Sequence, residues 1–245
     1  MFKYIFSDEK KWAVFEGDNA TLIKSKNLDS VRNEAKYLEK IISSINTFEN
    51  AIDCGACYGV WTYLLHPYFK KVYAFELAGV HRQCFLKNMS AFNINNFELF
   101  PFGLGDKTIK SFVGNDKWAI DRYGYAAYNA KIVEDKNGNE NVTTLDSFNL
   151  KNISFIKIDV EGYDHLVIKG LMKTIKKYKP IILVEYNIEN FHLIIKYLKN
   201  YKPHIYNIKD NNLLKLKKHF YKTMISRSNK FNLLSNRNIF FIPNE

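Results

Sequence analysis

The sequence is poor in several features that would restrict where and how it folds. It contains three cysteines and five prolines, and no apolar run approaches the roughly 20 residues that span a bilayer. An odd, low cysteine count does not make a disulfide framework. The first residues lack the apolar core of a signal peptide. We therefore expect a cytoplasmic protein without a membrane span. At 245 residues it is large enough to fold without a stabilising disulfide or metal ion.

Positive charge is abundant and unevenly distributed. The formal net charge is +11, and residues 201–245 hold nine lysines and arginines against two acidic residues. A basic segment of this kind attracts nucleic acid, anionic lipid or phosphorylated substrates. It is also what a solvated, lysine-rich surface looks like, and the composition does not distinguish the two interpretations.

Apolar spacing predicts an N-terminal cap followed by alternating strands and helices. Residues 1–49 are expected to form a hairpin with a turn at 17–19 and an amphipathic helix over 28–45. From residue 50 the alternation predicts one domain, 50–245, with a mostly parallel, doubly wound, Rossmann-like α/β sheet. The expected strands are 51–53, 71–76, 97–102, 153–159 and 180–185, the expected helices are 60–66, 80–89, 164–178 and 188–201, and runs 204–208 and 238–242 are expected to close the sheet as an antiparallel pair.

The alternation is interrupted once. Residues from about 107 to 150 have the pattern of antiparallel β structure around a turn at Asn137-Gly138. This segment carries Trp118, Tyr123, Tyr125 and Tyr128. Aromatic rings are suited to stacking on sugar faces and equally to ordinary core packing. We expect an inserted β unit that forms one wall of an acceptor site.

Acidic residues follow most of the predicted parallel strands. Ligands of open parallel sheets bind beyond the carboxyl ends of the strands. Asp53 precedes Gly55 and Gly59, which permit close backbone approach, and Glu76 ends the next strand, where a carboxylate can bind ribose hydroxyls. The loop is not the G-x-G-x-x-G of dinucleotide-binding proteins. An acidic rim favours a cationic ligand such as S-adenosylmethionine.

A second acidic cluster follows the most apolar strand. Asp159 and Glu161 stand two residues apart before Gly162, which permits a turn into a helix. Such a pair can act as a general base or hold a divalent ion. Asp164 is expected to cap the helix, and His165 in its first turn is a candidate base.

Three ordered segments carry a resemblance to a known family. Residues 51–56, residues 73–76 with Asn88, and residues 156–164 with Lys169-Gly170 resemble the FkbM methyltransferases, and 179–185 is similar to that family's next strand. The resemblance covers about residues 50–187. It implies a class I S-adenosylmethionine-dependent O-methyltransferase that acts on a hydroxyl of a sugar, a glycan or a similar small acceptor.

The sequence departs from the family's pattern twice, with Cys57 where Asn is usual and with Leu77-Ala78 in place of Pro-Ser. Neither departure removes a carboxylate. No metal site is expected. The predicted catalytic residues are Asp159, Glu161, His165 and Glu185; the predicted cofactor-binding residues are Asp53, Gly55, Ala56, Gly59, Glu76, Leu77, Gly103, Leu104, Asp106 and Asp159.

Three other functions compete with this prediction. The pair Cys54 and Cys57 has the spacing of a thioredoxin-like redox site. Methylation of an RNA ribose 2′-hydroxyl would use Asp159, Glu185 and either Lys169 or Lys173, with the basic C-terminal segment on the phosphates. A non-enzymatic binding module is the third alternative, and it would tolerate the loss of Asp159 and Glu161.

Overall fold

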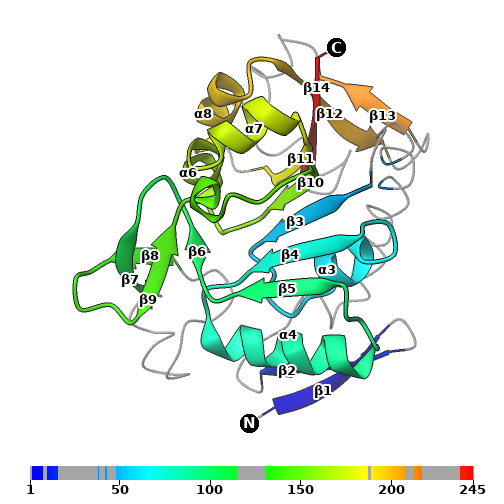
Figure 1. Cartoon of the computed structure of the whole chain (residues 1–245), viewed down its shortest axis with the longest axis vertical. Coiled ribbons are helices and arrows are strands. Elements are labelled where there is room, and N and C mark those ends of the chain that lie inside the picture. Colours follow the sequence, from blue (N-terminus) through cyan, green and yellow to red (C-terminus); the bar gives the residue numbers. More distant parts are fainter. Residues whose placement is uncertain are drawn as a thin grey trace.

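A computed structural model of the chain describes residues 2–7, 10–15, 38, 42, 48–114, 131–186, 189–207, 212–216 and 238–244. These residues form an eight-stranded sheet, a four-stranded sheet and a two-stranded hairpin (Figure 1). The aromatic residues expected to wall the acceptor site and most of the basic C-terminal segment lie outside the described residues. Of the predicted helix over 28–45, only Leu38 and Ile42 are described, and both are helical and buried.

The large sheet has the predicted doubly wound α/β architecture. Its strand order is β13-β12-β14-β11-β10-β3-β4-β5. Strands β5, β4, β3, β10 and β11 run parallel, and β14 pairs antiparallel with both β11 and β12. The expected antiparallel closing pair is thus confirmed. The strands are β3 (Asn50–Cys54), β4 (Lys71–Phe75), β5 (Phe97–Phe100), β10 (Ile153–Ile158), β11 (Ile181–Glu185), β12 (Tyr201–Asn207), β13 (Asn212–Lys215) and β14 (Asn238–Pro243).

Helices cover both faces of this sheet because its strands are apolar on both sides. On β10, Ile156 and Ile158 pack on one face with Val167 of α6 (Asp164–Lys169), Ile175 of α7 (Met172–Tyr178) and Ile194 of α8 (Phe191–Tyr197). On the opposite face, Phe155 packs with Trp61 and Leu65 of α3 (Val60–Leu65). Such two-sided burial is what near-continuous apolar strands in a parallel sheet require.

The order of the strands reverses between β3 and β10. From β3 the chain adds β4 and β5 on one side, and later adds β11 on the far side of β10. In register, Asp53 lies opposite Lys157 and Cys54 opposite Ile158. The carboxyl ends of β3 and β10 therefore meet at the topological switch point, where ligands of such sheets bind.

The inserted segment forms the smaller sheet, and its antiparallel character is confirmed. Strand β7 (Ile109–Gly114) pairs antiparallel with β8 (Lys131–Glu134) and with β9 (Glu140–Thr143). Gly103 and Leu104, predicted to bind the cofactor, form the short strand β6, parallel to β9. The insertion is therefore joined to the main sheet directly after β5 (Figure 1).

The N-terminal hairpin lies earlier in the chain than predicted. Strand β1 (Phe2–Ser7) pairs antiparallel with β2 (Lys10–Phe15), with Ser7 opposite Lys10. The expected turn at 17–19 lies outside the described residues. The hairpin packs on α4 (Gly79–Ala91), and Asn88 links the two by accepting a hydrogen bond from the Ala13 N–H at 2.6 Å.

The prediction of a single helix over 164–178 is wrong, because the structure divides this segment into α6 and α7. Gly170 ends α6 and lies against the chain that follows β6. A Cβ at Gly170 would lie 1.8 Å from the Gly105 carbonyl oxygen. The apolar spacing is continuous across the break, so periodicity alone does not reveal it.

A carboxylate from a distant segment caps the N-terminus of α7. Asp146 accepts hydrogen bonds from the Lys173 N–H at 2.8 Å and the Thr174 N–H at 2.9 Å. We expect Asp146→Ala to lower the free energy of unfolding by about 1–2 kcal/mol, as for other lost helix caps, measured by urea unfolding. The matched control is Asp135→Ala, which removes a hydrogen bond within an exposed turn. Equal losses in the two variants would contradict this role.

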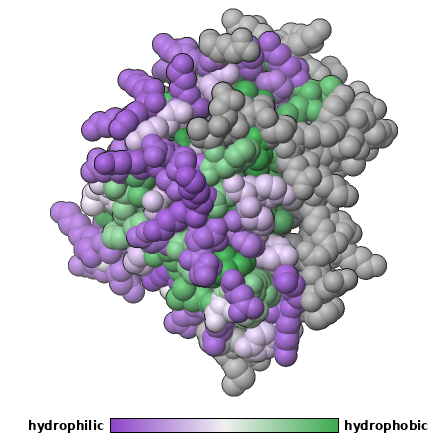
Figure 2. Space-filling view, turned by 45° about the vertical axis from the view of Figure 1, so that its right-hand side comes forward, coloured by the Kyte–Doolittle hydropathy of each residue, from purple (hydrophilic) through white to green (hydrophobic). Residues whose placement is uncertain are grey.

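The described helices are short. Among the described residues, no helix is long and apolar enough to cross a membrane. On the face shown in Figure 2, the hydrophobic areas of the described residues are interrupted by hydrophilic side chains.

Candidate functional site

The turn after β3 brings the two predicted site segments into contact. Gly55 has φ +78, and a Cβ there would lie 2.0 Å from the Asp159 carbonyl oxygen. The N–H groups of Gly55 and Ala56 donate to the Phe75 carbonyl oxygen at 2.9 and 3.0 Å. Glycine is required here because the backbone is left-handed and touches the end of β10. The predicted cofactor loop is thus fixed against both neighbouring strands.

A buried lysine that the sequence did not single out lies at the centre of this arrangement. Lys157 is 4% exposed, and its Nζ donates to the Gly55 carbonyl oxygen at 3.0 Å. The same Nζ lies 3.5 Å from Asp53 Oδ1 and 3.6 Å from Asp159 Oδ2. Burial alone lowers the pKa of Lys157, but Asp159 and Asp53 outweigh it and raise the pKa above its ordinary value. Lys157 is therefore a cation that joins the ends of β3 and β10.

Asp53, predicted to bind the cofactor, is fully buried. Its Oδ2 accepts a hydrogen bond from Thr62 Oγ1 at 2.8 Å. Burial raises its pKa, and the Lys157 charge opposes that shift. Asp53 thus lies beneath the loop and supports it through Lys157 and Thr62.

Glu76 follows β4 and is held by the neighbouring backbone. Its two carboxylate oxygens accept hydrogen bonds from the N–H groups of Cys57 and Ala78, each at 2.8 Å. His81 Nδ1 lies 3.5 Å from Oε1. Burial raises the pKa of Glu76, but His81 and the two N–H donors outweigh it, and the pKa falls below its ordinary value. The ionised carboxylate is fixed beside the loop, as a ribose-binding group would need to be.

Three carboxylates gather where β10 and β11 end. Glu185, the last residue of β11, interacts with Asp159 and Glu161, and its side chain forms a hydrogen bond with Asp159. Burial and the charges of Asp159 and Glu161 raise the pKa of Glu185 to about 8. At neutral pH Glu185 is therefore mainly protonated and donates to the Asp159 carboxylate. Glu161 has φ +53, a conformation that is uncommon outside glycine and that clusters at functional sites.

The raised pKa of Glu185 makes stability depend on pH. A carboxyl whose pKa is higher in the folded protein stabilises it below the unfolded pKa, and this contribution is lost as pH rises towards about 8. We expect Glu185→Gln to reduce the fall in unfolding free energy between about pH 5 and pH 8 by about 1 kcal/mol, allowing for solvent screening. Urea unfolding across this range measures it. Glu134→Gln, at an exposed ion pair, is the control, and an unchanged slope in Glu185→Gln would refute the assignment.

Asp164 does not cap the helix as expected. It is 1% exposed, and it accepts hydrogen bonds from the Val160 and Gly162 N–H groups, each at 3.2 Å. Asn190 donates to the Gly162 carbonyl oxygen at 2.9 Å. Asp164 and Asn190 therefore hold the turn that carries Asp159 and Glu161, and the helix begins without a side-chain cap.

The other predicted residues lie around this centre. His165 is half-buried, and its Nδ1 has no hydrogen-bond partner among the described residues. Gly59 has φ +87, and a Cβ there would lie 2.7 Å from Met89. Gly103 packs against Leu77, and the Leu104 side chain is in the apolar core.

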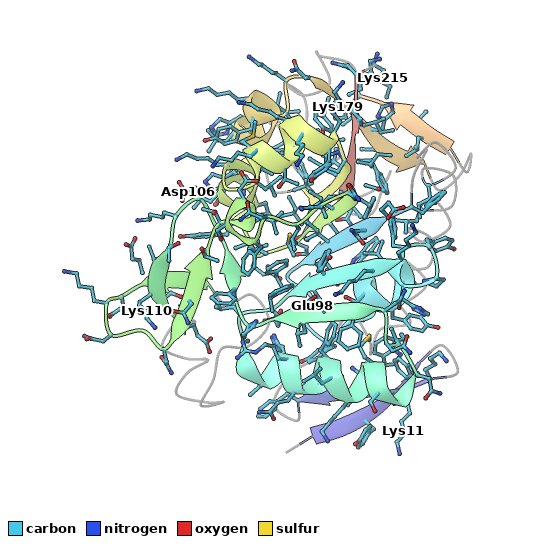
Figure 3. The ribbon with its side chains drawn as sticks, viewed as in Figure 1. Lys11, Glu98, Asp106, Lys110, Lys179 and Lys215 are labelled. Carbon is cyan, nitrogen blue, oxygen red and sulfur yellow. The ribbon has the colours of Figure 1, made fainter. Side chains whose placement is uncertain are left out.

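Asp106 is close to the site but already paired. Its Oδ2 lies 2.7 Å from Lys169 Nζ on α6, and Figure 3 shows Asp106 beside that helix. The hydrogen bond and charge of Lys169 lower the pKa of Asp106. Lys169 is thereby engaged with Asp106, which weakens its predicted role as an activating lysine.

Neither a metal cluster nor a disulfide is found within the described ranges. No group of three or more His, Cys, Asp or Glu side chains there is arranged to hold a metal ion. The cysteines are free thiols, and Cys54 and Cys84 are buried. The arrangement is thus a glycine turn and fixed carboxylates around one buried lysine.

Comparisons with known proteins give one family. A family model described as the methyltransferase FkbM domain matches residues 53–203. A search of curated proteins finds no match.

Several solved structures are weakly similar. An FkbM methyltransferase from Methylobacillus flagellatus is 16% identical. The aligned region covers 93% of this chain and 55% of that chain, with a TM-score of 0.48. An rRNA methylase from Streptococcus thermophilus is 13% identical, with coverages of 88% and 95% and a TM-score of 0.48. A precorrin-6y methyltransferase from Geobacter metallireducens is 9% identical, with coverages of 91% and 90% and a TM-score of 0.45. Similarities this weak say nothing about the acceptor.

Proposed function

This chain belongs to the FkbM methyltransferase family, and we propose that it methylates a hydroxyl of a sugar, a glycan or a similar small acceptor. Family membership confirms the prediction that the chain is an S-adenosylmethionine-dependent methyltransferase. The observation that carries the proposal for the acceptor is the acidic cluster of Asp159, Glu161 and the protonated Glu185, because Asp159 touches the Gly55 turn and interacts with Glu185. A hydroxyl must lose its proton when it is methylated, and positioned carboxylates supply the base.

The residues present fit the cofactor. Gly55 leaves the turn without a side chain. Glu76 is ionised and fixed by two N–H donors; His81 also lies beside Oε1, and Oε2 keeps a further lone pair for a ribose hydroxyl. The Asp159 side chain is 30% exposed, and its backbone carbonyl lies against the same turn. When bound, S-adenosylmethionine supplies an electrophilic methyl group on a sulfonium cation, and an acidic rim suits that charge.

The chain's own contribution is to place the acceptor and accept its proton. Asp159 is flanked by the Lys157 ammonium and by Glu185, which donates a hydrogen bond to it. These two neighbours fix the orientation of the Asp159 carboxylate. We infer that Asp159 or Glu161 takes the hydroxyl proton and then releases it to solvent. His165 stays a candidate base in the same region.

We further infer that residues 50–245 form one methyltransferase domain and that 1–49 cap it. Asn88 of α4 supports this arrangement, because its Nδ2 donates to the Ala13 carbonyl oxygen at 3.0 Å and to the Tyr58 carbonyl oxygen at 2.9 Å. One buried side chain thus connects the N-terminal hairpin with the cofactor loop.

Calorimetric titration with S-adenosylhomocysteine tests the cofactor site. We expect binding of S-adenosylhomocysteine, and none of NADH or of a plain nucleotide under the same conditions. A panel of sugar and glycan hydroxyl acceptors then tests the substrate class with methyl-labelled cofactor. Failure of S-adenosylhomocysteine to bind would contradict the cofactor site, whereas binding without labelling of any glycan would contradict only the acceptor.

RNA ribose methylation is the second candidate, because of the basic C-terminal segment. Contacts with phosphates weaken steeply with salt. If RNA is the acceptor, salt-dependent binding is expected, and it should decrease when Lys215, Lys217 and Lys218 are neutralised. No RNA binding at physiological salt would exclude this candidate.

A further inference from the structure

The turn that carries Glu76 lies against the inserted sheet. Glu76, Leu77 and Ala78 link β4 to α4. A Cβ at Gly103 in β6 would lie 3.2 Å from Leu77 Cδ2 and 3.1 Å from Val142 Cγ2 in β9. Leu77 and Val142 therefore both pack on Gly103. The segment that carries the predicted ribose-binding carboxylate is thus in contact with the smaller sheet.

An arginine of α4 binds the backbone of this turn. Arg82, in the first turn of the helix, donates from Nη1 to the Glu76 carbonyl oxygen at 3.0 Å and to the Leu77 carbonyl oxygen. Nη1 carries two N–H bonds, so it can serve both carbonyls. Hydrogen bonds from a charged donor are about twice as strong as those between neutral groups. One side chain thus holds two successive peptide groups directly after β4.

The same guanidinium group faces an acid of the inserted sheet. Glu140 Oε2 in β9 lies 3.9 Å from Arg82 Nη1, and the two side chains are 24% and 23% exposed. Burial raises the pKa of Glu140, the Arg82 charge opposes that shift, and the Glu76 charge adds to it. Glu140 and Val142 stand two residues apart on β9, so their side chains are on the same face of the strand. The face of β9 that packs on Gly103 therefore also supplies the acidic partner of Arg82.

We propose that Arg82 is a positioning residue for the cofactor, which fixes the ribose-binding Glu76 and connects it to the inserted sheet through Glu140. Arg82 acts through the backbone, because the peptide groups after Glu76 and Leu77 set the direction of the Glu76 side chain. A carboxylate that is already fixed loses less conformational freedom when the ligand binds, so the affinity is higher. The inference rests on the proposed function, in which Glu76 binds the ribose hydroxyls.

The first test is the calorimetric affinity for S-adenosylhomocysteine in four variants. Arg82→Met keeps an apolar side chain of similar reach without the donors, and we expect about tenfold weaker binding. Arg82→Lys, which keeps the charge, should recover part of this loss. Glu140→Gln keeps the hydrogen bonds to the turn but removes the ion pair, and about threefold weaker binding is expected. Glu134→Gln, at an exposed ion pair of the same inserted sheet, is the matched control and should bind like the unmodified protein.

The second test uses an analogue of S-adenosylhomocysteine without the ribose 2′- and 3′-hydroxyls. This ligand has no hydroxyl for Glu76 to bind, so Arg82→Met and the unmodified protein should bind it equally, to within about twofold. Competition with radiolabelled S-adenosylhomocysteine measures the weaker affinities. A merely structural role for Arg82 would weaken both ligands to the same extent. An equal loss for the two ligands, or unchanged S-adenosylhomocysteine affinity in Arg82→Met, overturns the proposal.

Amide hydrogen exchange without cofactor tests the hold on Glu76 directly. The N–H groups of Cys57 and Ala78 donate to Glu76, and in Arg82→Met we expect them to exchange at least about fivefold faster. Unchanged exchange overturns the proposal. If Arg82→Met does not fold, Glu140→Gln decides, and affinity and exchange equal to those of Glu134→Gln overturn it. Failure of the unmodified protein to bind S-adenosylhomocysteine would contradict the proposed function, whereas the exchange measurement still tests whether Arg82 fixes Glu76.

Discussion

Replacing Asp159 with asparagine is expected to reduce turnover by about 100- to 10,000-fold, the usual contribution of a positioned general base. Asparagine keeps the shape of the side chain but does not accept a proton from the acceptor hydroxyl. The affinity for S-adenosylhomocysteine should change by less than about 1 kcal/mol, because the lost interaction belongs to the transition state. Steady-state kinetics and calorimetry on the same preparation measure the two effects.

Glu161→Gln tests the other member of the pair in the same way. If the two carboxylates act as one unit, the double variant should be little worse than the more damaged single variant, since effects within such a unit are not additive. Glu98→Gln is the matched control, because it removes a carboxylate from an exposed ion pair with Lys71 on β5 and β4. Retained turnover in both Asp159→Asn and Glu161→Gln would refute the role of the pair.

The Asp159→Asn variant has a second consequence at Glu185. The pKa of Glu185 is raised by burial first and then by the neighbouring carboxylates, Asp159 foremost. The substituted amide would carry no charge, so we expect the pKa of Glu185 to fall in that variant. A smaller pH dependence of stability would accompany the loss of turnover, which distinguishes a lost charge from general disruption of the site.

The sequence predicted those parts of the fold that follow from local pattern. Apolar strands followed by acids indicated a parallel sheet with its site at the switch point, and the structure brings Gly55 against Asp159 there. Local patterns do not report contacts between distant segments. The break at Gly170 depends on a contact with Gly105, and the start of α7 depends on Asp146. Both were missed for that reason.

Asp164 shows a different limit of sequence reasoning. Its place before a helical pattern is typical of a cap, yet its carboxylate points back to the N–H groups of Val160 and Gly162. Both arrangements use an acid to accept backbone hydrogen bonds. Only the direction of the turn distinguishes them, and that direction depends on the positive φ of Glu161 and Gly162.

Lys157 lies within residues 156–164, one of the segments that resemble the FkbM family, but the sequence did not identify it as a site residue. The available signal was a charged residue within the apolar run 153–158, every residue of which is buried. A buried ammonium requires a partner. Asp159, two residues further on, would have been one candidate partner. Asp53 would have been missed, because only the strand order shows that β3 and β10 are neighbours.

Replacing Lys157 with methionine is expected to lower the free energy of unfolding by about 3–5 kcal/mol, the usual cost of removing one partner from a buried ion pair. Asp53, 0% exposed, would lose the cation that opposes the rise of its pKa. The Gly55 carbonyl oxygen would lose its donor as well. Urea unfolding measures the loss, with Lys70→Met at an exposed ion pair as the control, expected to cost less than about 1 kcal/mol.

The pH dependence and a double variant separate lost charge from lost packing. With Lys157 gone, the pKa of Asp53 rises further, so the destabilisation should shrink as pH falls and the carboxyl takes a proton. Asp53→Asn in the Lys157→Met background removes the uncompensated charge at any pH. We therefore expect the double variant to be more stable than Lys157→Met alone at neutral pH and to lose the difference in acid. If the double variant is no more stable, Lys157 acts through packing, and the buried pair does not hold the ends of β3 and β10 together by charge.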